Sequence, residues 1–125
     1  MGKLIYVSKW LLVCLLFATI ALVMDEKNAD AFSDQVIQQG ATGDDVIELQ
    51  ARLQYIGFYN GVIDGIFGWG TYWAVRNFQY EFGLEVDGLV GQQMKDKLVQ
   101  VTEYDRVYVM RHLEQGNTPK HYGGA

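Results

Sequence analysis

Several aromatic and polar side chains lie close together in the sequence between Trp69 and Tyr80, in the middle of the chain. Flat rings of this kind cover the C–H faces of sugars and short peptides, and amide or guanidinium groups beside them donate hydrogen bonds. A guanidinium such as that of Arg76 also pairs well with a carboxylate. These residue types in one short stretch predict a binding surface. The candidate residues are Trp69, Tyr72, Trp73, Arg76, Asn77 and Tyr80, together with Tyr59 at the close of the preceding helix.

A helix must position most of these side chains, and the pattern predicts one that is capped by Thr71 and ended by Gly83. On a helical wheel the core side carries Ala74, Val75, Phe78 and Phe82, and the opposite side carries Trp73, Arg76, Asn77 and Tyr80. The second side either binds a ligand or packs inside the protein. In the packing alternative, Trp73 and Tyr80 cover the C-terminal extension, whose apolar segment at 107–110 would otherwise be exposed.

Two further helices are predicted on either side of this one. The first covers 44–56, with Asp44 accepting from the N–H groups of its first turn and Gly57 ending it. Its helically spaced residues are Val46, Leu49, Gln50, Leu53 and Ile56. The third begins near Gln92 and continues toward Gln115, because no Gly or Pro interrupts it before Gly116. The expected fold is a small all-α domain of three helices with a C-terminal tail.

The segments that join these helices repeat one pattern. Residues 64–71 read DGIFGWGT and residues 87–94 read DGLVGQQM, 23 residues further along. An Asp-Gly pair predicts a tight turn with a positive φ at the glycine, and the apolar Phe67 or Val90 that follows is expected in the core. We assign the polar residues around these turns to structure, where they satisfy loop N–H groups. They are Gln50, Gln79, Asp64 and Asp87.

The chain opens with an apolar run from Trp10 to Met24 that follows Lys3 and Lys9. With the small residues Ala29 and Ala31 after it, the run predicts a secretory signal peptide that is cut before Phe32. An uncleaved anchor and a buried core helix are the alternatives. The expected organisation is a signal peptide at 1–31, a polar lead-in at 32–43, a domain at 44–102 and an extension at 103–125. The only cysteine, Cys14, lies inside the apolar run, so the mature chain would have no thiol chemistry.

Composition disfavours several classes of function. The formal net charge of −5 repels phosphate backbones, so a nucleic-acid partner is not expected. The carboxylates are turn residues or stand at helix positions expected to be exposed, such as Glu48 and Glu81, and do not suggest the paired acids of a glycosidase. His112 and His121 lie nine residues apart without zinc-site spacing. We therefore expect no catalytic residue, no metal and no cofactor.

The residues from about Gly40 to Leu98 resemble the common bacterial peptidoglycan-binding module. The matching pattern consists of Val46, Leu49, Gln50, Leu53, Gly57, Phe58, Tyr59, Asp64, Gly65, Phe67, Gly68, Thr71, Ala74, Val75, Phe78, Gln79, Asp87, Gly88, Val90 and Gly91. Met94 departs from the pattern, because the family usually has threonine there as the cap of the last helix. The resemblance implies a three-helix fold that binds peptidoglycan through its glycan or its stem peptide.

More narrowly, the start of the chain and the segments at 31–50 and 68–79 resemble the N-terminal half of spore cortex-lytic enzymes. This resemblance implies a secreted targeting module that acts at the spore cortex or cell wall during germination, without the catalytic domain of that family. It implies contact with a membrane only through the signal segment. Two alternatives stay open: a truncated or hidden cell-wall hydrolase, and a module that docks a germination accessory protein.

Overall fold

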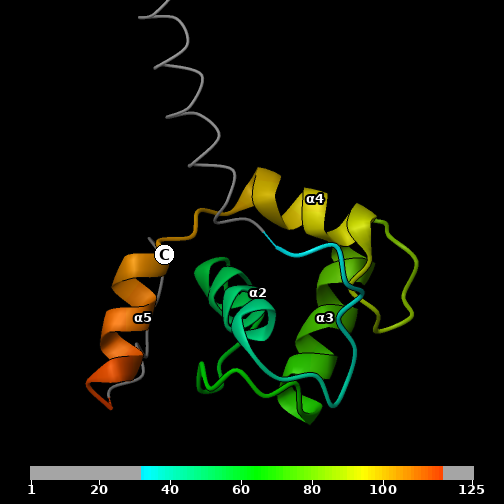
Figure 1. Ribbon diagram of the computed structural model, residues 1–125. Helices are drawn as coiled ribbons and strands as arrows, with labels where there is room; N and C mark the ends of the chain where they lie inside the picture. The colour runs from blue at the N-terminus through cyan, green and yellow to red at the C-terminus, as the bar shows by residue number, and fades with distance from the viewer. Residues whose placement is uncertain (1–31, 117–125) are drawn as a thin grey trace, which may run out of the picture. The chain divides into compact units, whose positions relative to one another are not determined.

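The computed structural model describes residues 32–116, which form four helices and no β-strand (Figure 1). The helices are α2 (Asp44–Tyr55), α3 (Trp69–Glu81), α4 (Gln92–Val101) and α5 (Arg106–Glu114). The all-α prediction is therefore confirmed for this part of the chain. The predicted signal segment at 1–31 and residues 117–125 lie outside the described residues. Among the helices at 44–114, none is long and apolar enough to cross a membrane.

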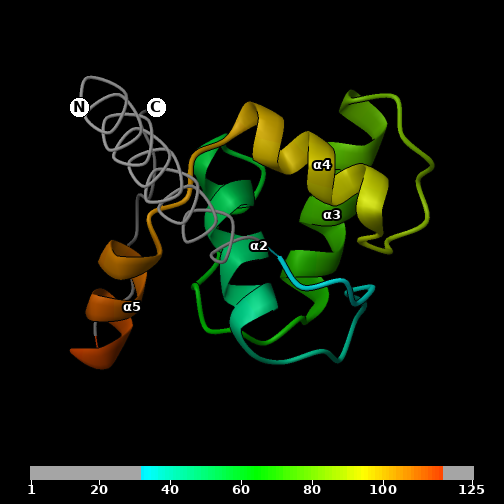
Figure 2. The ribbon, with the colours of Figure 1, turned by 45° about the horizontal axis from the view of Figure 1, so that its top comes forward.

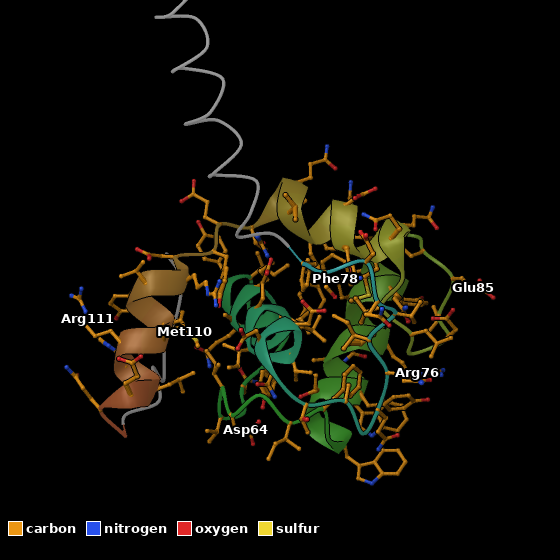
Figure 3. The ribbon with its side chains drawn as sticks, in the orientation of Figure 1. Asp64, Arg76, Phe78, Glu85, Met110 and Arg111 are labelled. Atoms are coloured by element: carbon orange, nitrogen blue, oxygen red, sulfur yellow. The ribbon has the colours of Figure 1, made fainter. Side chains whose placement is uncertain are left out.

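Helices α2, α3 and α4 share one hydrophobic core with the loops between them. Phe78, which points from α3 into the protein in Figure 3, packs edge to face on Phe58 with ring centroids 5.6 Å apart. The buried members of this core are Ile37, Val46, Leu49, Leu53, Tyr59, Phe67, Ala74, Val75, Phe78, Val90, Met94 and Leu98. The helical spacing therefore predicted the buried faces of α2 and α3 correctly, with Ile56 and Phe82 partly buried at their ends, and Phe67 and Val90 lie in the core as expected.

The two Asp-Gly turns have the same backbone geometry. Gly65 and Gly88 both have φ of +74°, in the left-handed region that favours glycine, as the sequence predicted. Each turn pairs with the segment at 32–43 through an isolated β-bridge, Thr42 with Ile66 and Ile37 with Val90. The lead-in segment thus runs past both turns and ties them to each other.

The start of the described chain is held by charged side chains. Asp45 accepts from the backbone N–H of Ser33 at 3.0 Å and also from its hydroxyl. The buried Lys95 donates from Nζ to the carbonyl oxygens of Ser33, at 2.6 Å, and Gln35. The prediction that Asp44 caps α2 was wrong, because the cap residue is Gly43 and no side chain bonds the first turn. Asp45, the residue after Asp44, bonds the lead-in segment at 32–43 instead.

Thr102 ends α4 and divides the long third helix that the sequence predicted. Its backbone is extended, with φ −132° and ψ 164°, and its side-chain hydroxyl donates to the carbonyl oxygen of Leu98 while accepting from Arg52 Nη1 at 3.0 Å. Asp105 then caps α5 by accepting from the N–H of Tyr108 at 3.0 Å. In Figures 1 and 2, α2 lies between α5 and α3. The C-terminal extension therefore contributes a short helix that packs on α2.

Candidate functional site

The candidate surface is built on α3, which begins three residues earlier than the sequence predicted. Gly68 is the cap residue, with extended backbone at φ −99° and ψ −162°, and Trp69 is the first residue of the helix. Thr71 is not the cap: it is buried, and its side-chain oxygen accepts from Gln50 Nε2 at 3.0 Å. Because Thr71 faces inward, Trp69 is directed outward, and 65% of its surface is exposed.

Three rings form a continuous aromatic group on the first turns of α3. Trp69 meets Tyr72 edge to face with ring centroids 5.5 Å apart, and Tyr72 meets Trp73 in the same way at 5.3 Å. Edge-to-face contact is a favoured arrangement for aromatic pairs, so the rings hold one another in place. Trp73 remains 55% exposed although it is packed on one side. The group therefore offers two indole rings to solvent on a rigid helix.

Arg76 places a positive charge beside these rings. Its guanidinium carbon lies 5.7 Å from the ring centroid of Tyr72 and 5.8 Å from that of Trp73, which is the range of cation–π attraction. Its Nη1 also donates to the Tyr72 hydroxyl at 3.2 Å. Figure 3 shows Arg76 on the outer side of α3, away from the core. We call Trp69, Tyr72, Trp73 and Arg76 together the aromatic face.

The remaining candidates divide into two groups. Asn77 and Tyr80 lie further along α3 and are exposed, Tyr80 by 75% of its surface. Tyr59 is only 7% exposed, and its hydroxyl donates to the carbonyl oxygen of Val62 at 2.6 Å. Burial raises the pKa of this hydroxyl above its ordinary value of 10.0. The structure thus brings four candidates together, extends them with two more, and keeps Tyr59 inside the protein.

The alternative in which Trp73 and Tyr80 cover the C-terminal extension is wrong. Val109, from the apolar segment at 107–110, is buried against Ala51 of α2 and Ile63 of the following loop. Partly buried residues complete this second cluster: Ile47, Tyr55, Tyr104 and Leu113. The extension therefore packs on the opposite side of α2, and the outer side of α3 keeps its exposed rings.

Gln50 and Gln79 organise the two turns in the same way. Gln50 Oε1 accepts from the N–H groups of Asp64 and Gly65 at 3.0 and 2.9 Å, and its Nε2 donates to Asp64 Oδ1 at 3.0 Å. Gln79 repeats these bonds with Asp87 and Gly88. The assignment of these polar residues to structure is confirmed. Because an added Cβ on Gly88 would lie 2.4 Å from Tyr72 Cε2, the second turn also touches the aromatic face.

The sequence did not predict the buried ion pair of Glu48 and Arg52. Glu48 was expected to be exposed, but it is only 4% exposed and accepts from Arg52 Nε at 2.8 Å. Burial raises the pKa of this carboxyl above its ordinary value of 4.5, and the bond to Arg52 opposes that shift. The spacing of four residues between an acid and an arginine was the available signal. Since Arg52 also reaches Thr102 and lies over the rings of Phe32 and Tyr104, the pair joins α2 to both ends of the domain.

Much of this chain is similar in sequence to known bacterial proteins. Residues 42–98 match the family model described as "Putative peptidoglycan binding domain". The chain is 64% identical over 114 residues to the spore cortex-lytic enzyme of Oceanobacillus iheyensis, covering 91% of this chain and 41% of the relative. It is 63% identical over 106 residues to the enzyme of the same name from Bacillus subtilis, covering 84% of this chain and 35% of the relative. The chain thus spans roughly two fifths of the length of these curated relatives.

A solved structure is similar over a whole domain. The crystal structure of the SleB N-terminal domain superposes with a TM-score of 0.58 and is 67% identical in sequence. The match covers 58% of this chain and 100% of that one. The relative's domain therefore folds as a separate chain.

Proposed function

Because this chain belongs to the peptidoglycan-binding domain family that includes the N-terminal domain of SleB, we propose that it holds the bacterial wall polymer through its aromatic face. The observation that carries this proposal is the group of exposed rings on α3 with Arg76 fixed beside them. The proposed action is binding, and it requires no bond to be made or broken.

The rings suit the chemistry of an amino-sugar polymer. The C–H faces of a pyranose ring stack on flat aromatic groups, and Trp69 and Trp73 expose such groups on neighbouring turns of one helix. Rigid aromatic side chains lose little conformational freedom on binding, so most of the contact energy is retained. Tyr80 continues the surface along the helix, with Asn77 supplying an amide.

Arg76 provides a positive charge between an acidic chain and an acidic polymer. The chain has a formal net charge of −5, whereas peptidoglycan carries the carboxylates of its stem peptides. A guanidinium held against two rings is already partly desolvated, so it pairs with a carboxylate more strongly than a solvated one would. We assign to Arg76 the contact with a stem carboxylate that lies close to the stacked sugars.

The biological setting follows from the relatives' printed names. We propose that the ligand is spore cortex peptidoglycan and that the domain keeps a cortex-lytic enzyme at its substrate during germination. Such a role requires export, which the signal-like segment at 1–31 would provide. The candidate contact residues are Trp69, Tyr72, Trp73, Arg76, Asn77 and Tyr80. The buried Tyr59 packs against the first turn of α3 that carries them.

Co-sedimentation tests the proposal. Residues 32–125 are mixed with purified cortex fragments or vegetative sacculi, and the bound protein and any released muropeptides are measured. We expect binding without release. The Trp69→Ala, Arg76→Ala double variant should bind at least about tenfold more weakly, because two contacts of hot-spot type are lost.

A matched control removes an aromatic ring and an arginine elsewhere. Tyr108 and Arg111 are exposed on α5, and Figure 3 shows Arg111 pointing away from α2. The Tyr108→Ala, Arg111→Ala double variant should sediment like the wild type. Equal binding by the two double variants would overturn the assignment of the aromatic face, and release of muropeptides by the wild type would overturn a purely binding role.

A further inference from the structure

A cavity of about 200 Å³ opens at the second Asp-Gly turn. It lies between the end of α3, the loop at 82–91 and the first turn of α4. The lining includes Gln79, Leu84, Asp87, Leu89, Gln93 and Met94. Glu85 lines it from the loop, and Figure 3 shows this residue at the outer edge of the loop between α3 and α4.

The equivalent place at the first turn is filled by the ring of Tyr59. The Tyr59 hydroxyl accepts from Gln50 Nε2 at 3.4 Å and interacts with the side chain of Thr71. Its Cε1 would lie 3.9 Å from a Cβ on Gly70. The ring therefore sits beside the glutamine and against the first turn of the next helix.

The two repeats correspond through their Asp-Gly turns and through the glutamines that bond these turns, although the glutamine and the Asp are 14 residues apart in the first repeat and eight in the second. Gln50, Gly70 and Thr71 in the first repeat correspond to Gln79, Gln93 and Met94 in the second. The latter three all line the cavity. The cavity thus stands where the first repeat buries a tyrosine ring of its own.

Loop length explains why the second repeat does not fill this place itself. Gly57 and Asp64 are seven residues apart, whereas Gly83 and Asp87 are only four apart. The shorter loop lacks the residues needed to turn a side chain back under the helix. The second repeat therefore has an open cavity where the first repeat has the ring of Tyr59.

The chemistry around the cavity fits a small amide with a methyl group. Leu84, Leu89 and Met94 supply apolar contact. The first helical bond of α4 runs from Lys95 N to the Gly91 carbonyl, so the N–H groups of Gln92 and Gln93 precede the helical ladder and point toward its N-terminal end. These donors suit an amide oxygen, and the carboxylates of Glu85 and Asp87 suit an amide N–H. The same carboxylates disfavour an anionic guest.

We propose that this cavity is a subsite for the N-acetyl group of an amino sugar. Its volume lies below the ~300–1,000 Å³ of pockets that enclose whole ligands, so it accepts one substituent of a larger molecule. It also adjoins the aromatic face, because Tyr72 packs on Gly88 between Asp87 and Leu89. A glycan chain stacked on the indole rings can therefore place an acetamido group in the cavity. This inference rests on the proposed function and specifies the part of the polymer that is read.

The test is an NMR titration of ¹⁵N-labelled residues 32–125 with N,N′,N″-triacetylchitotriose. We expect saturable shifts of the backbone amides of Gly91, Gln92 and Gln93, and no such shifts with cellotriose, which has the same type of sugar backbone without acetamido groups. The Gln93→Tyr variant places a ring in the cavity, as Tyr59 does in the first repeat, and should weaken chitotriose binding at least tenfold. Gln100→Tyr is the matched control, because Gln100 is an exposed residue of the same helix outside the cavity lining.

The outcomes separate this inference from the proposed function. Sedimentation of the wild type with sacculi, together with an absence of chitotriose shifts at 91–93, would overturn the subsite and leave the binding role intact. Shifts confined to the indole N–H groups of Trp69 and Trp73, or equal binding by the Gln93→Tyr and Gln100→Tyr variants, would also overturn it. Shifts at 91–93 caused only by an L-alanyl-D-isoglutamine peptide would assign the cavity to the stem peptide instead. A wild type that fails to sediment would overturn both proposals.

Discussion

Replacing Gln50 by leucine should remove more stability than replacing Gln79 by leucine, although the two glutamines make the same bonds to their turns. Leucine has a similar size and no polar atom, so Gln50→Leu leaves the N–H groups of Asp64 and Gly65 without their acceptor. Both variants remove a donor to a loop carbonyl, that of Ile66 or that of Leu89, but only Gln50→Leu also removes the donor to a buried hydroxyl, that of Thr71. The comparison of the two variants isolates what the extra partners contribute.

The magnitude follows from which groups can reach water. Gly65 is buried, and leaving its N–H unpaired costs about 2 kcal/mol, while the exposed Asp64 N–H and the Thr71 hydroxyl cost about 1 kcal/mol each. Better burial of the leucine side chain returns about 1 kcal/mol, so the expected net loss is about 3 kcal/mol. Gln79→Leu leaves the N–H groups of Asp87 and of the buried Gly88, and the Leu89 carbonyl, without their partners, but the adjacent cavity admits water to them and no buried hydroxyl loses a donor. The expected loss there is about 1–2 kcal/mol.

Urea unfolding of residues 32–125, followed by circular dichroism at 222 nm, measures both values. A domain of this size is expected to have a free energy of unfolding of about 4–13 kcal/mol, so both variants should still fold. With a slope of about 1.5 kcal/mol per molar urea, Gln50→Leu should lower the midpoint by about 2 M and Gln79→Leu by about 1 M. Equal losses, or a Gln50→Leu loss below about 1 kcal/mol, would refute the reasoning that the Thr71 contact and the exclusion of water from the first turn set the cost.

Three other predictions concern the turns, the lead-in segment and the buried ion pair. Gly88→Ala should lower the free energy of unfolding in urea by at least about 2 kcal/mol, because φ at Gly88 is +74° and the new Cβ would lie 2.4 Å from Tyr72. The control Gly68→Ala should lower it by less than about 1 kcal/mol, because φ at Gly68 is −99° and no atom lies within 4 Å of the new Cβ. Lys95→Met should lower the free energy of unfolding by about 1–3 kcal/mol, because the carbonyls of Ser33 and Gln35 lose their donor. It should also speed hydrogen exchange of the Ile37 amide, whereas the control Lys97→Met should leave that exchange rate unchanged. Because burial raises the pKa of Glu48 in the folded state, that state binds the proton more tightly than the unfolded chain does, and the contribution of Glu48 to stability falls as pH rises through the window just above 4.5. The wild type should therefore gain stability relative to Glu48→Gln as pH is lowered from 7 toward 4.5, and thermal unfolding that shows a constant difference between the two proteins would contradict this.

Local sequence determined the elements and the turns. The spacing of Val46, Leu49 and Leu53 and that of Val75 and Phe78 predicted buried helix faces, because a helix with one apolar stripe has only one side to bury. The glycines at 57, 65, 83 and 88 all have the positive φ that their surroundings predicted. The outward direction of Trp73 and Arg76 followed from the same helical wheel, so much of the candidate site could be read before the fold was known.

Tertiary contacts decided the rest, because they join residues that no local pattern connects. Thr71 has the chemistry of a cap, yet its partner is Gln50, 21 residues earlier, and α3 begins at Trp69 as a result. Thr102 interrupts an otherwise good helical pattern while bonded to Arg52, 50 residues away.

Burial likewise depended on where distant segments pack. Tyr59 is buried and is not part of the exposed candidate surface, because the loop after α2 places its ring against the start of α3. Glu48 became buried through its pair with Arg52, which itself lies against Phe32 and Tyr104 from the two ends of the domain. The cavity beside Gln79 exists because one loop is shorter than the other, a difference that is visible in the sequence but whose consequence depends on the packing around it. Sequence by itself determined which apolar side chains of α2 and α3 face inward, and the tertiary structure decided which polar groups are buried, where the helices end and which space is left open.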